Sequence, residues 1–215
     1  LPAGPGVRVT AMTGVSTVAT VIVSALSVSS ISHATIDAPA LESRNLGAPG
    51  MLGIDALQGH SVAIDFDRNV MMVKPSRKRS STMRRDAGDI VISARSLFGQ
   101  LIVTDARYRG RRIAVVIDTG SAISVGNGAL RTVMADRLRP IGSVSMLGAT
   151  GGILTADAFA VDGIEIGGIG FRHFQIAFAD APPFARFGLA DRPAVLLGMD
   201  SLRLFRSVDI DFANR

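Results

Sequence analysis

The chain repeats a short motif, and this self-similarity limits its possible folds more than any other feature. Residues 51–57 read Met-Leu-Gly-Ile-Asp-Ala-Leu, and residues 196–202 read Leu-Leu-Gly-Met-Asp-Ser-Leu. A second match follows each copy, since residues 62–66 (Val-Ala-Ile-Asp-Phe) resemble residues 208–212 (Val-Asp-Ile-Asp-Phe). Similar motifs in the same order predict two copies of one structural unit.

The repeat divides the chain unequally. Weaker matches extend it backward, relating residues 37–39 to 180–182 and residues 11–14 to 149–152. Residues 1–73 are therefore expected to form the C-terminal part of a first unit, and residues 90–215 a complete second unit. Residues 74–89 are expected to be a linker between them. The front half of the second unit has no counterpart in the first.

The second unit has an acidic residue at the end of a predicted buried strand, where an unpaired charge costs free energy. The apolar residues 115–117 read as a buried strand, which ends in Asp118, Thr119, Gly120 and Ser121. An unpaired buried charge costs free energy, so an acid here is expected to have a function. Gly120 permits a tight turn, and the Thr119 hydroxyl can bond within the loop. The alternative is an ordinary turn between two strands.

Two further motifs give this turn a context. Residues 146–154 (Met-Leu-Gly-Ala-Thr-Gly-Gly-Ile-Leu) are rich in glycine, and residues 194–198 (Ala-Val-Leu-Leu-Gly) form an apolar run that ends in glycine. Asp-Thr-Gly-Ser, a glycine-rich segment and apolar-apolar-Gly, in this order, resemble the aspartic proteases of the retroviral type. The resemblance covers residues 90–215, with residues 146–154 in the place of the family's flap.

The resemblance implies an all-β acid-protease fold with two homologous β-barrel-like lobes, of which the N-terminal one is incomplete. It implies that Asp118 is catalytic, that Thr119 braces its loop and that Gly120 lets the backbone pass close behind. The residues that it assigns to substrate binding lie in the turn and the flap: Ser121, Ala122, Gly148, Ala149, Thr150, Gly151 and Gly152.

The family's chemistry needs two carboxylates that share one proton, because two acids about 3 Å apart cannot both ionise. This chain offers one of them, Asp118. The second would come from upstream residues of the same gene or from a second copy in a homodimer. The implied substrate is an extended polypeptide, without cofactor or metal. A non-catalytic peptide-binding relative is the alternative function.

Charge is concentrated in the linker. The chain has a formal net charge of +5, and residues 74–88 hold six Lys or Arg residues against one Asp. A nucleic-acid surface would be expected to interleave aromatic side chains with basic ones, and none occurs there. We interpret the segment as a solvated linker and expect no nucleic-acid partner. The absence of Cys does not identify a compartment; the resemblance leans towards a bacterial periplasmic or secreted protein.

Local patterns predict many strands and few helices. Strands are expected at residues 100–108 and 112–117, and a flap hairpin at residues 143–159. Asn127 is a predicted N-cap for a helix at residues 129–137, and Asp200 for a helix at residues 201–205.

Residues 15–31 are apolar, but they are rich in Val, Ser and Thr and short for the roughly 20 residues of a membrane span. They are predicted to be strands. Asp37 is expected in a turn, and Asp65 and Asp211 on exposed strand faces.

Overall fold

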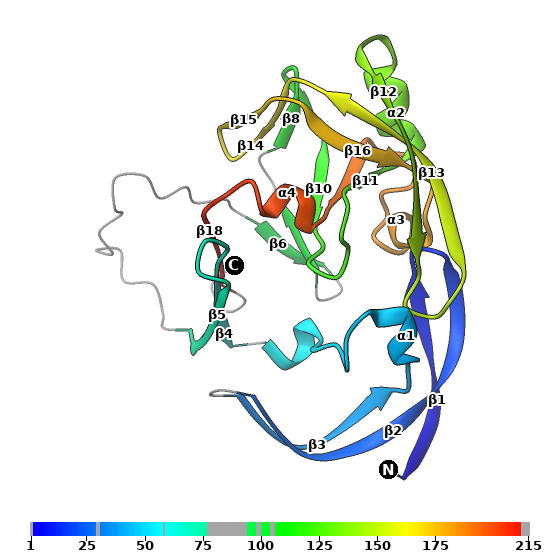
Figure 1. The fold of residues 1–215 in the computed structure, drawn as a ribbon, viewed down its shortest axis with the longest axis vertical. Helices are drawn as coiled ribbons and strands as arrows, with labels where there is room; N and C mark the ends of the chain where they lie inside the picture. The colour runs from blue at the N-terminus through cyan, green and yellow to red at the C-terminus, as the bar shows by residue number, and fades with distance from the viewer. Residues whose placement is uncertain are drawn as a thin grey trace.

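The computed structural model describes residues 2–28, 31–57, 59–76, 94–97, 100–103 and 106–211. Strands make up 53% of the protein and helices 15%, and a curled half-barrel sheet dominates it, which confirms the all-β class (Figure 1). Of the predicted linker, residues 77–89 lie outside the described residues.

The N-terminal half begins with three long strands. They are β1 (Ala3–Ala11), β2 (Gly14–Val28) and β3 (Ile31–Pro39), which pair antiparallel in the order β1-β2-β3. The predicted strands in residues 15–31 are therefore present as β2 and the start of β3. In the described part of the chain, no helix is long and apolar enough to cross a membrane. Asp37 pairs with Ile22 inside the sheet, so the predicted turn there is wrong: β2 supplies the backbone partner that keeps the segment extended.

Two short helices and a hairpin complete this half. α1 (Ser43–Leu46) and the 3-10 helix η1 (Ile54–Leu57) precede β4 (His60–Asp65) and β5 (Val70–Pro75). β5 runs two residues past the boundary predicted after Val73, because Lys74 and Pro75 still pair with β4.

The second half contains the remaining elements of Figure 1. Its strands are β6 (Ala94–Leu97), β7 (Gln100–Val103), β8 (Ala106–Tyr108), β9 (Arg111–Arg112), β10 (Ala114–Ile117), β11 (Val125–Gly126), β12 (Arg139–Leu147), β13 (Ile153–Val161), β14 (Ile164–Ile166), β15 (Ile169–Phe171), β16 (Phe174–Phe178), β17 (Ala194–Leu197) and β18 (Ser207–Asp211). Its helices are α2 (Gly128–Met134), the 3-10 helix η2 (Ala135–Arg137), α3 (Pro182–Arg186) and α4 (Met199–Leu202).

Several predicted elements are confirmed with different ends. Asn127 caps α2, since its side-chain oxygen accepts a hydrogen bond from the Leu130 amide at 2.9 Å. The β12–β13 hairpin extends beyond the residues predicted for a flap hairpin, because its strands pair from Arg139–Ala160 to Leu147–Ile153. Asp200 does not cap α4; Gly198 occupies the N-cap position, and no side chain bonds there.

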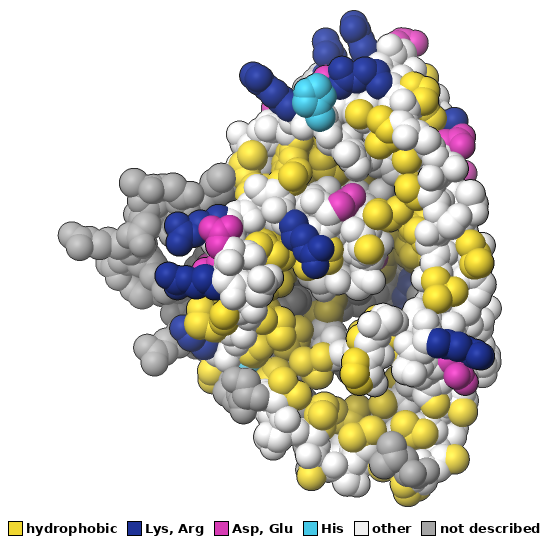
Figure 2. Space-filling model, in the orientation of Figure 1, with side chains coloured by type: hydrophobic (Ala, Val, Ile, Leu, Met, Phe, Trp, Pro, Cys, Tyr) yellow, Lys and Arg dark blue, Asp and Glu magenta, His cyan; other side chains and the backbone are white. Residues whose placement is uncertain are grey.

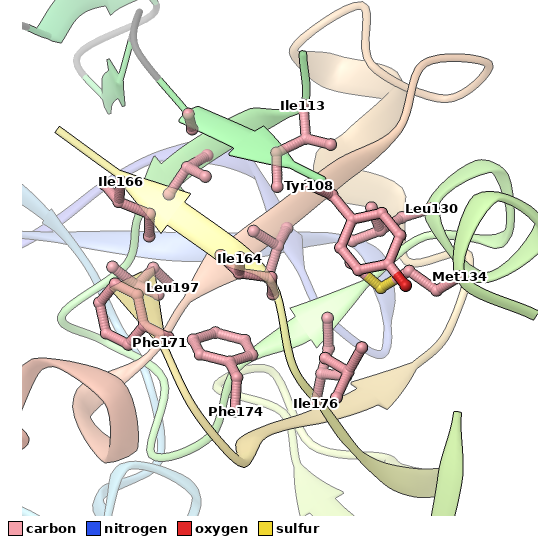
Figure 3. Packing of buried hydrophobic residues seen from close by; sticks show 14 of the residues in the cluster. Tyr108, Ile113, Leu130, Met134, Ile164, Ile166, Phe171, Phe174, Ile176 and Leu197 are labelled. Carbon is pink, nitrogen blue, oxygen red and sulfur yellow. The ribbon is translucent and has the colours of Figure 1, made fainter. Parts of the chain in front are cut away.

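An eight-stranded sheet forms the framework of the second half, in the order β12-β13-β16-β11-β17-β10-β7-β6. β17 is buried along its whole length, which suits an apolar strand covered on both faces. One core cluster lies on this framework and contains Tyr108, Leu130, Ile164 and Phe174 (Figure 3). Burying an aromatic such as Phe174 fully stabilises the fold by about 1.5–3 kcal/mol.

The two halves share a third sheet, in the order β18-β4-β5. Val208 pairs with Ile64, and Ile210 pairs with Val62. Apolar side chains from both halves form a cluster around this sheet, with Ile31, Val62, Val73 and Ile210 buried.

Two acids of this shared sheet are less exposed than predicted. Asp65 is half-buried and accepts a hydrogen bond from the Arg68 amide at 2.9 Å. Asp211 is also half-buried and accepts one from the Ser76 hydroxyl at 2.7 Å. The turn after β4 and the end of β5 provide these donors, which alternation along a strand does not reveal.

Candidate active site

The loop that carries Asp118 crosses the end of a neighbouring strand, β17. β10 is parallel to β17, and β11 lies on the other side of β17. The loop from β10 to β11 must therefore pass over the end of β17, where Gly198 lies. A Cβ atom at Gly198 would overlap the Ile123 carbonyl. The apolar-apolar-Gly motif thus has a physical reason. Its two apolar residues end a buried strand, and its glycine leaves room for the loop that crosses there.

Backbone hydrogen bonds fix this loop to the end of β17 and the start of α4. The Asp118 amide donates to the Leu197 carbonyl at 3.0 Å, and the Met199 amide donates to the Ser121 carbonyl at 2.9 Å. The Ser121 hydroxyl donates to the Ile123 carbonyl at 2.8 Å, so it acts within the loop. The loop that carries the acid is therefore held at both of its ends.

The Asp118 carboxyl group lies in the turn that these bonds define. Its Oδ1 atom accepts a hydrogen bond from the Gly120 amide at 3.1 Å. Burial raises the pKa of Asp118 above its ordinary value, and the Gly120 amide opposes this by favouring the charged form. Thr119 and Gly120 are exposed. A carboxyl group with a raised pKa beside exposed backbone can hold or release a proton towards a bound molecule.

A second acid, Asp200, stabilises the same loop through Ser124. The Asp200 carboxylate accepts hydrogen bonds from the Ser124 amide at 3.0 Å and from the Ser124 hydroxyl at 2.7 Å. The Ser124 oxygen in turn accepts one from the Gly198 amide at 3.0 Å and lies 2.7 Å from the Ser201 hydroxyl. Every polar atom of Ser124 in this buried cluster has a partner, as buried polar groups require.

The roles of Ser124 and Asp200 were not predicted from the sequence. Their partnership spans 76 residues and leaves no local pattern. The repeated motif was the available signal, because Asp55 and Asp200 occupy matching positions after its glycine.

The glycine-rich segment that was predicted to be a flap forms a tight loop between β12 and β13, called the flap loop below. The Gly148 amide donates to the Gly152 carbonyl at 3.1 Å, and the Gly151 amide donates to the Gly148 carbonyl at 2.9 Å. Gly151 and Gly152 have φ angles of 87° and 80°, a region that favours glycine. Ala149 and Thr150 complete the loop and are half-buried.

The flap loop receives a residue from the N-terminal half. Thr13, in the turn between β1 and β2, donates its hydroxyl to the Gly151 carbonyl at 2.8 Å. A Cβ atom at Gly148 would overlap the Thr13 hydroxyl, so Gly148 makes room for it. Met12 and Met146, from the two hairpins, pack against one apolar cluster together with Ile123.

The predicted site residues thus form two groups. Asp118, Thr119, Gly120, Ser121 and Ala122 lie in the crossing loop, and residues 148–152 form the flap loop. Among the described residues no hydrogen bond joins the two groups. Ile123 and Met146, which lie close to them in the chain, pack against the same apolar cluster. Figure 2 shows a face that is hollowed between the long hairpins and the body of the molecule, with apolar side chains around the hollow.

No metal centre is apparent in the part of the chain that the structure describes, where no three His, Cys, Asp or Glu side chains are grouped as a metal would need. Asp118 and Asp200 are instead bound to amides and hydroxyls.

Part of the chain is similar to a known protein family. No curated protein matches the chain significantly. Residues 104–201 match the family described as Aspartyl protease, which is related to the retropepsins. The matched span contains the Asp118 loop, both flap strands, β17 and the Asp200 cluster. Residues 104–201, a little under half of the chain, are thus similar to the aspartyl protease family.

Proposed function

We propose that the protein is an aspartic endopeptidase and that Asp118 is one of its two catalytic carboxylates. The observation that carries the proposal is the position of Asp118: a carboxyl group with a raised pKa, at the end of a central strand, in a loop fixed on both sides. The family match supports a peptidase-type hydrolase.

The reaction requires a second carboxylate beside Asp118. One acid, charged, takes a proton from a water molecule held between the two, and the other donates a proton to the peptide carbonyl. Burial favours the protonated form of Asp118, which suits sharing a proton within a pair that titrates as a unit. The second acid comes from outside these residues, either from a longer form of the chain or from a second copy.

The substrate is an extended polypeptide. The flap loop and the crossing loop offer exposed or half-buried backbone at Ala122, Thr150 and Gly152, which can bond a peptide as an added strand. Thr119 and Gly120 shape the turn, and the Ser121 hydroxyl holds the Ile123 carbonyl through a hydrogen bond.

The experiment follows binding and cleavage of an unstructured polypeptide together. The 215-residue chain and an upstream-extended gene product are each incubated with it at acidic and neutral pH, and new amino termini are identified by mass spectrometry. Cleavage by the form that supplies a second aspartate is the expected result. Binding without cleavage in every such form would replace the proposal with a peptide-binding relative.

A further inference from the structure

Seven arginines lie at the end of the second half where β12 begins, and we call this surface the arginine end. Six of them are exposed and one, Arg107, is half-buried. They are Arg107, Arg109, Arg111, Arg112, Arg137, Arg139 and Arg172. Among the described residues, three acids lie beside them, namely Asp136, Asp162 and Glu165. Positive charge is therefore in clear excess at this end.

Strand register brings these separate stretches of the chain together. Tyr108 pairs with Ile164, which places the β8–β9 turn beside the β13–β14 turn. β13 pairs with both β12 and β16 from this same end, so the start of β12 and the β15–β16 turn complete the surface. Figure 2 shows Lys and Arg side chains gathered there, over β8 and the segment that leads into β12.

Hydrogen bonds fix the turns to one another. The Arg109 amide donates to the Gly163 carbonyl at 2.9 Å. The carboxylate of the preceding residue, Asp162, accepts hydrogen bonds from the Arg139 side chain at 2.8 Å and from the His173 amide at 2.6 Å. Arg139 thus offsets the charge of the acid at the centre of the surface. The arginine end is a fixed arrangement of turns in which the remaining arginines surround one neutralised pair.

The arginines spread outward and do not converge on one point. They come from different turns and strand ends, and the β8–β9 turn projects as a tight two-residue turn in which Arg109 and Gly110 have φ angles of 48° and 84°. A set of charged turn tips suits a broad anionic surface better than a small ligand held in a cleft. The planar guanidinium group binds phosphate oxygens in pairs, so phosphate is the matching anion.

The surface lacks the features of a nucleic-acid site. A single strand would need exposed aromatic side chains on which bases stack, but the described aromatic residues of these segments, Tyr108, Phe171 and Phe174, are buried. Reading a duplex groove takes a helix or a two-stranded ribbon, and β9 has two residues. An anionic bilayer requires only several positive charges that reach its plane together.

The position of the arginine end also suits a membrane. β12 runs from Arg139 at this end to Leu147 beside the flap loop. Its nine residues span roughly 26 Å at about 3.3 Å per residue. A membrane at the arginine end would therefore leave the flap loop accessible at the other end of the hairpin.

We propose that the arginine end binds the anionic phosphate headgroups of a phospholipid membrane and holds the protein on its surface with the flap loop directed away. The attachment is peripheral and electrostatic. It does not rest on the proposed peptidase activity.

The test measures sedimentation of the 215-residue protein with two kinds of vesicle at physiological ionic strength. One contains equal amounts of phosphatidylglycerol and phosphatidylcholine, and the other phosphatidylcholine alone. We expect binding to the first kind only, weakened by added salt. A fourfold variant (Arg109→Asn, Arg111→Gln, Arg137→Gln and Arg172→Gln) should bind at least about a hundredfold more weakly, because each lost charge weakens the attraction several-fold. Arg139 is kept because it neutralises Asp162.

A matched control removes four arginines from the rest of the exposed surface, through Arg44→Gln, Arg68→Gln, Arg203→Gln and Arg206→Gln. Its net charge equals that of the first variant, but its affinity should stay within about threefold of the original, because distant charges are screened. Both variants should keep the original melting temperature. The single change Arg172→Gln should weaken binding several-fold, which tests the proposal independently of the fourfold variant's folding.

Hydrogen exchange tests the orientation. Vesicles that contain phosphatidylglycerol should slow exchange of the amides at residues 109–111 and 172–173 and leave those at residues 148–152 unchanged. Slower exchange at residues 148–152 alone would contradict the proposal.

Three further results would overturn the membrane surface. The first is an equal loss of affinity in the matched control, which would make net charge the cause. The second is loss only on replacement of the linker's Arg77, Lys78, Arg79, Arg84 and Arg85 by Ser, which would make the linker the anchor. The third is tighter binding of duplex DNA or RNA than of the anionic vesicles, lost in the fourfold variant, which would make the arginine end a nucleic-acid surface.

Discussion

Asp118 combines burial with a single backbone donor, and this combination predicts a pH dependence of stability. Its pKa is raised, chiefly by burial, so folding favours the protonated acid. The stability it contributes is fully present below the ordinary pKa of aspartate and is lost as the pH rises through the raised value. Asp118→Asn should therefore raise the melting temperature at neutral pH, and the gain should disappear at pH values below the ordinary aspartate range.

Asp162 provides a control of opposite sign. The His173 amide donates to its carboxylate at 2.6 Å, and Arg139 lies 2.8 Å away, so the pKa of Asp162 is lowered. Its contribution is present above the ordinary pKa and is lost as the pH falls through the lowered value. Asp162→Asn should lower the melting temperature at neutral pH. Equal pH profiles for the two variants would contradict the assigned environment of Asp118.

Asp200 acts on Asp118 through the loop, so its removal should affect both stability and site geometry. Asp200→Ala leaves the Ser124 amide and hydroxyl without their acceptor, which should cost about 1–3 kcal/mol of unfolding free energy. Hydrogen exchange of amides 118–124 should accelerate. Asp157→Ala is the comparison, because Asp157 is exposed and, among the described residues, its side chain has a single surface ion pair, with Arg131. If Asp200→Ala changed stability and hydrogen exchange as little as Asp157→Ala, Asp200 would not be needed to hold the Asp118 loop.

At the scale of elements, the contact between the two hairpin tips should respond to the loss of one hydroxyl. Thr13→Val keeps the shape but removes the hydrogen bond to the Gly151 carbonyl, which should cost about 0.5–1.5 kcal/mol. The amides of residues 148–152 should exchange faster in this variant, whereas Thr13→Ser should exchange as the original protein does. Unchanged exchange in Thr13→Val would show that apolar packing of Met12 and Met146 holds the tips alone.

Structural features that depend on residues close together in the chain could be predicted from the sequence. Asn127 caps α2 as expected, because an N-cap acts within three residues. Asp200 resembled a cap equally well, but the fold uses its carboxylate for Ser124, far away in the chain. The extended conformation of Asp37 also depends on a residue far away in the chain, because Asp37 pairs with Ile22 of β2. The predicted strand at residues 100–108 is instead described as β7 and β8, which pair in different sheets.

At the scale of the whole molecule, the order of motifs along the chain correctly predicted the fold class and the resemblance of residues 104–201 to the aspartyl proteases. The positions of the two site loops relative to each other could not be predicted, because they depend on β17 lying between β10 and β11. The contact between the tips of the β1–β2 and β12–β13 hairpins also depends on how the two halves are oriented. The sequence of either half alone does not determine this orientation.

The basic segment provides a prediction at this scale. Replacement of Arg77, Lys78, Arg79, Arg84 and Arg85 by Ser removes five positive charges, equal to the formal excess of the chain. Folding and any peptidase activity should be nearly unchanged, as measured by melting temperature and cleavage rate. Loss of a salt-dependent affinity for nucleic acid that the protein's function requires would show instead that the segment is a binding surface.

The central claim is that Asp118 is one of two carboxylates that activate water. The most direct measurement is the cleavage rate of Asp118→Asn in a form of the protein that supplies a second aspartate, compared with the same form carrying Asp118. The substitution is nearly isosteric, so the protein should fold, but Asn cannot take up a proton from water. Because paired catalytic groups act as a unit, kcat should fall by several orders of magnitude, with binding of the polypeptide largely kept. Full activity of Asp118→Asn would contradict the account.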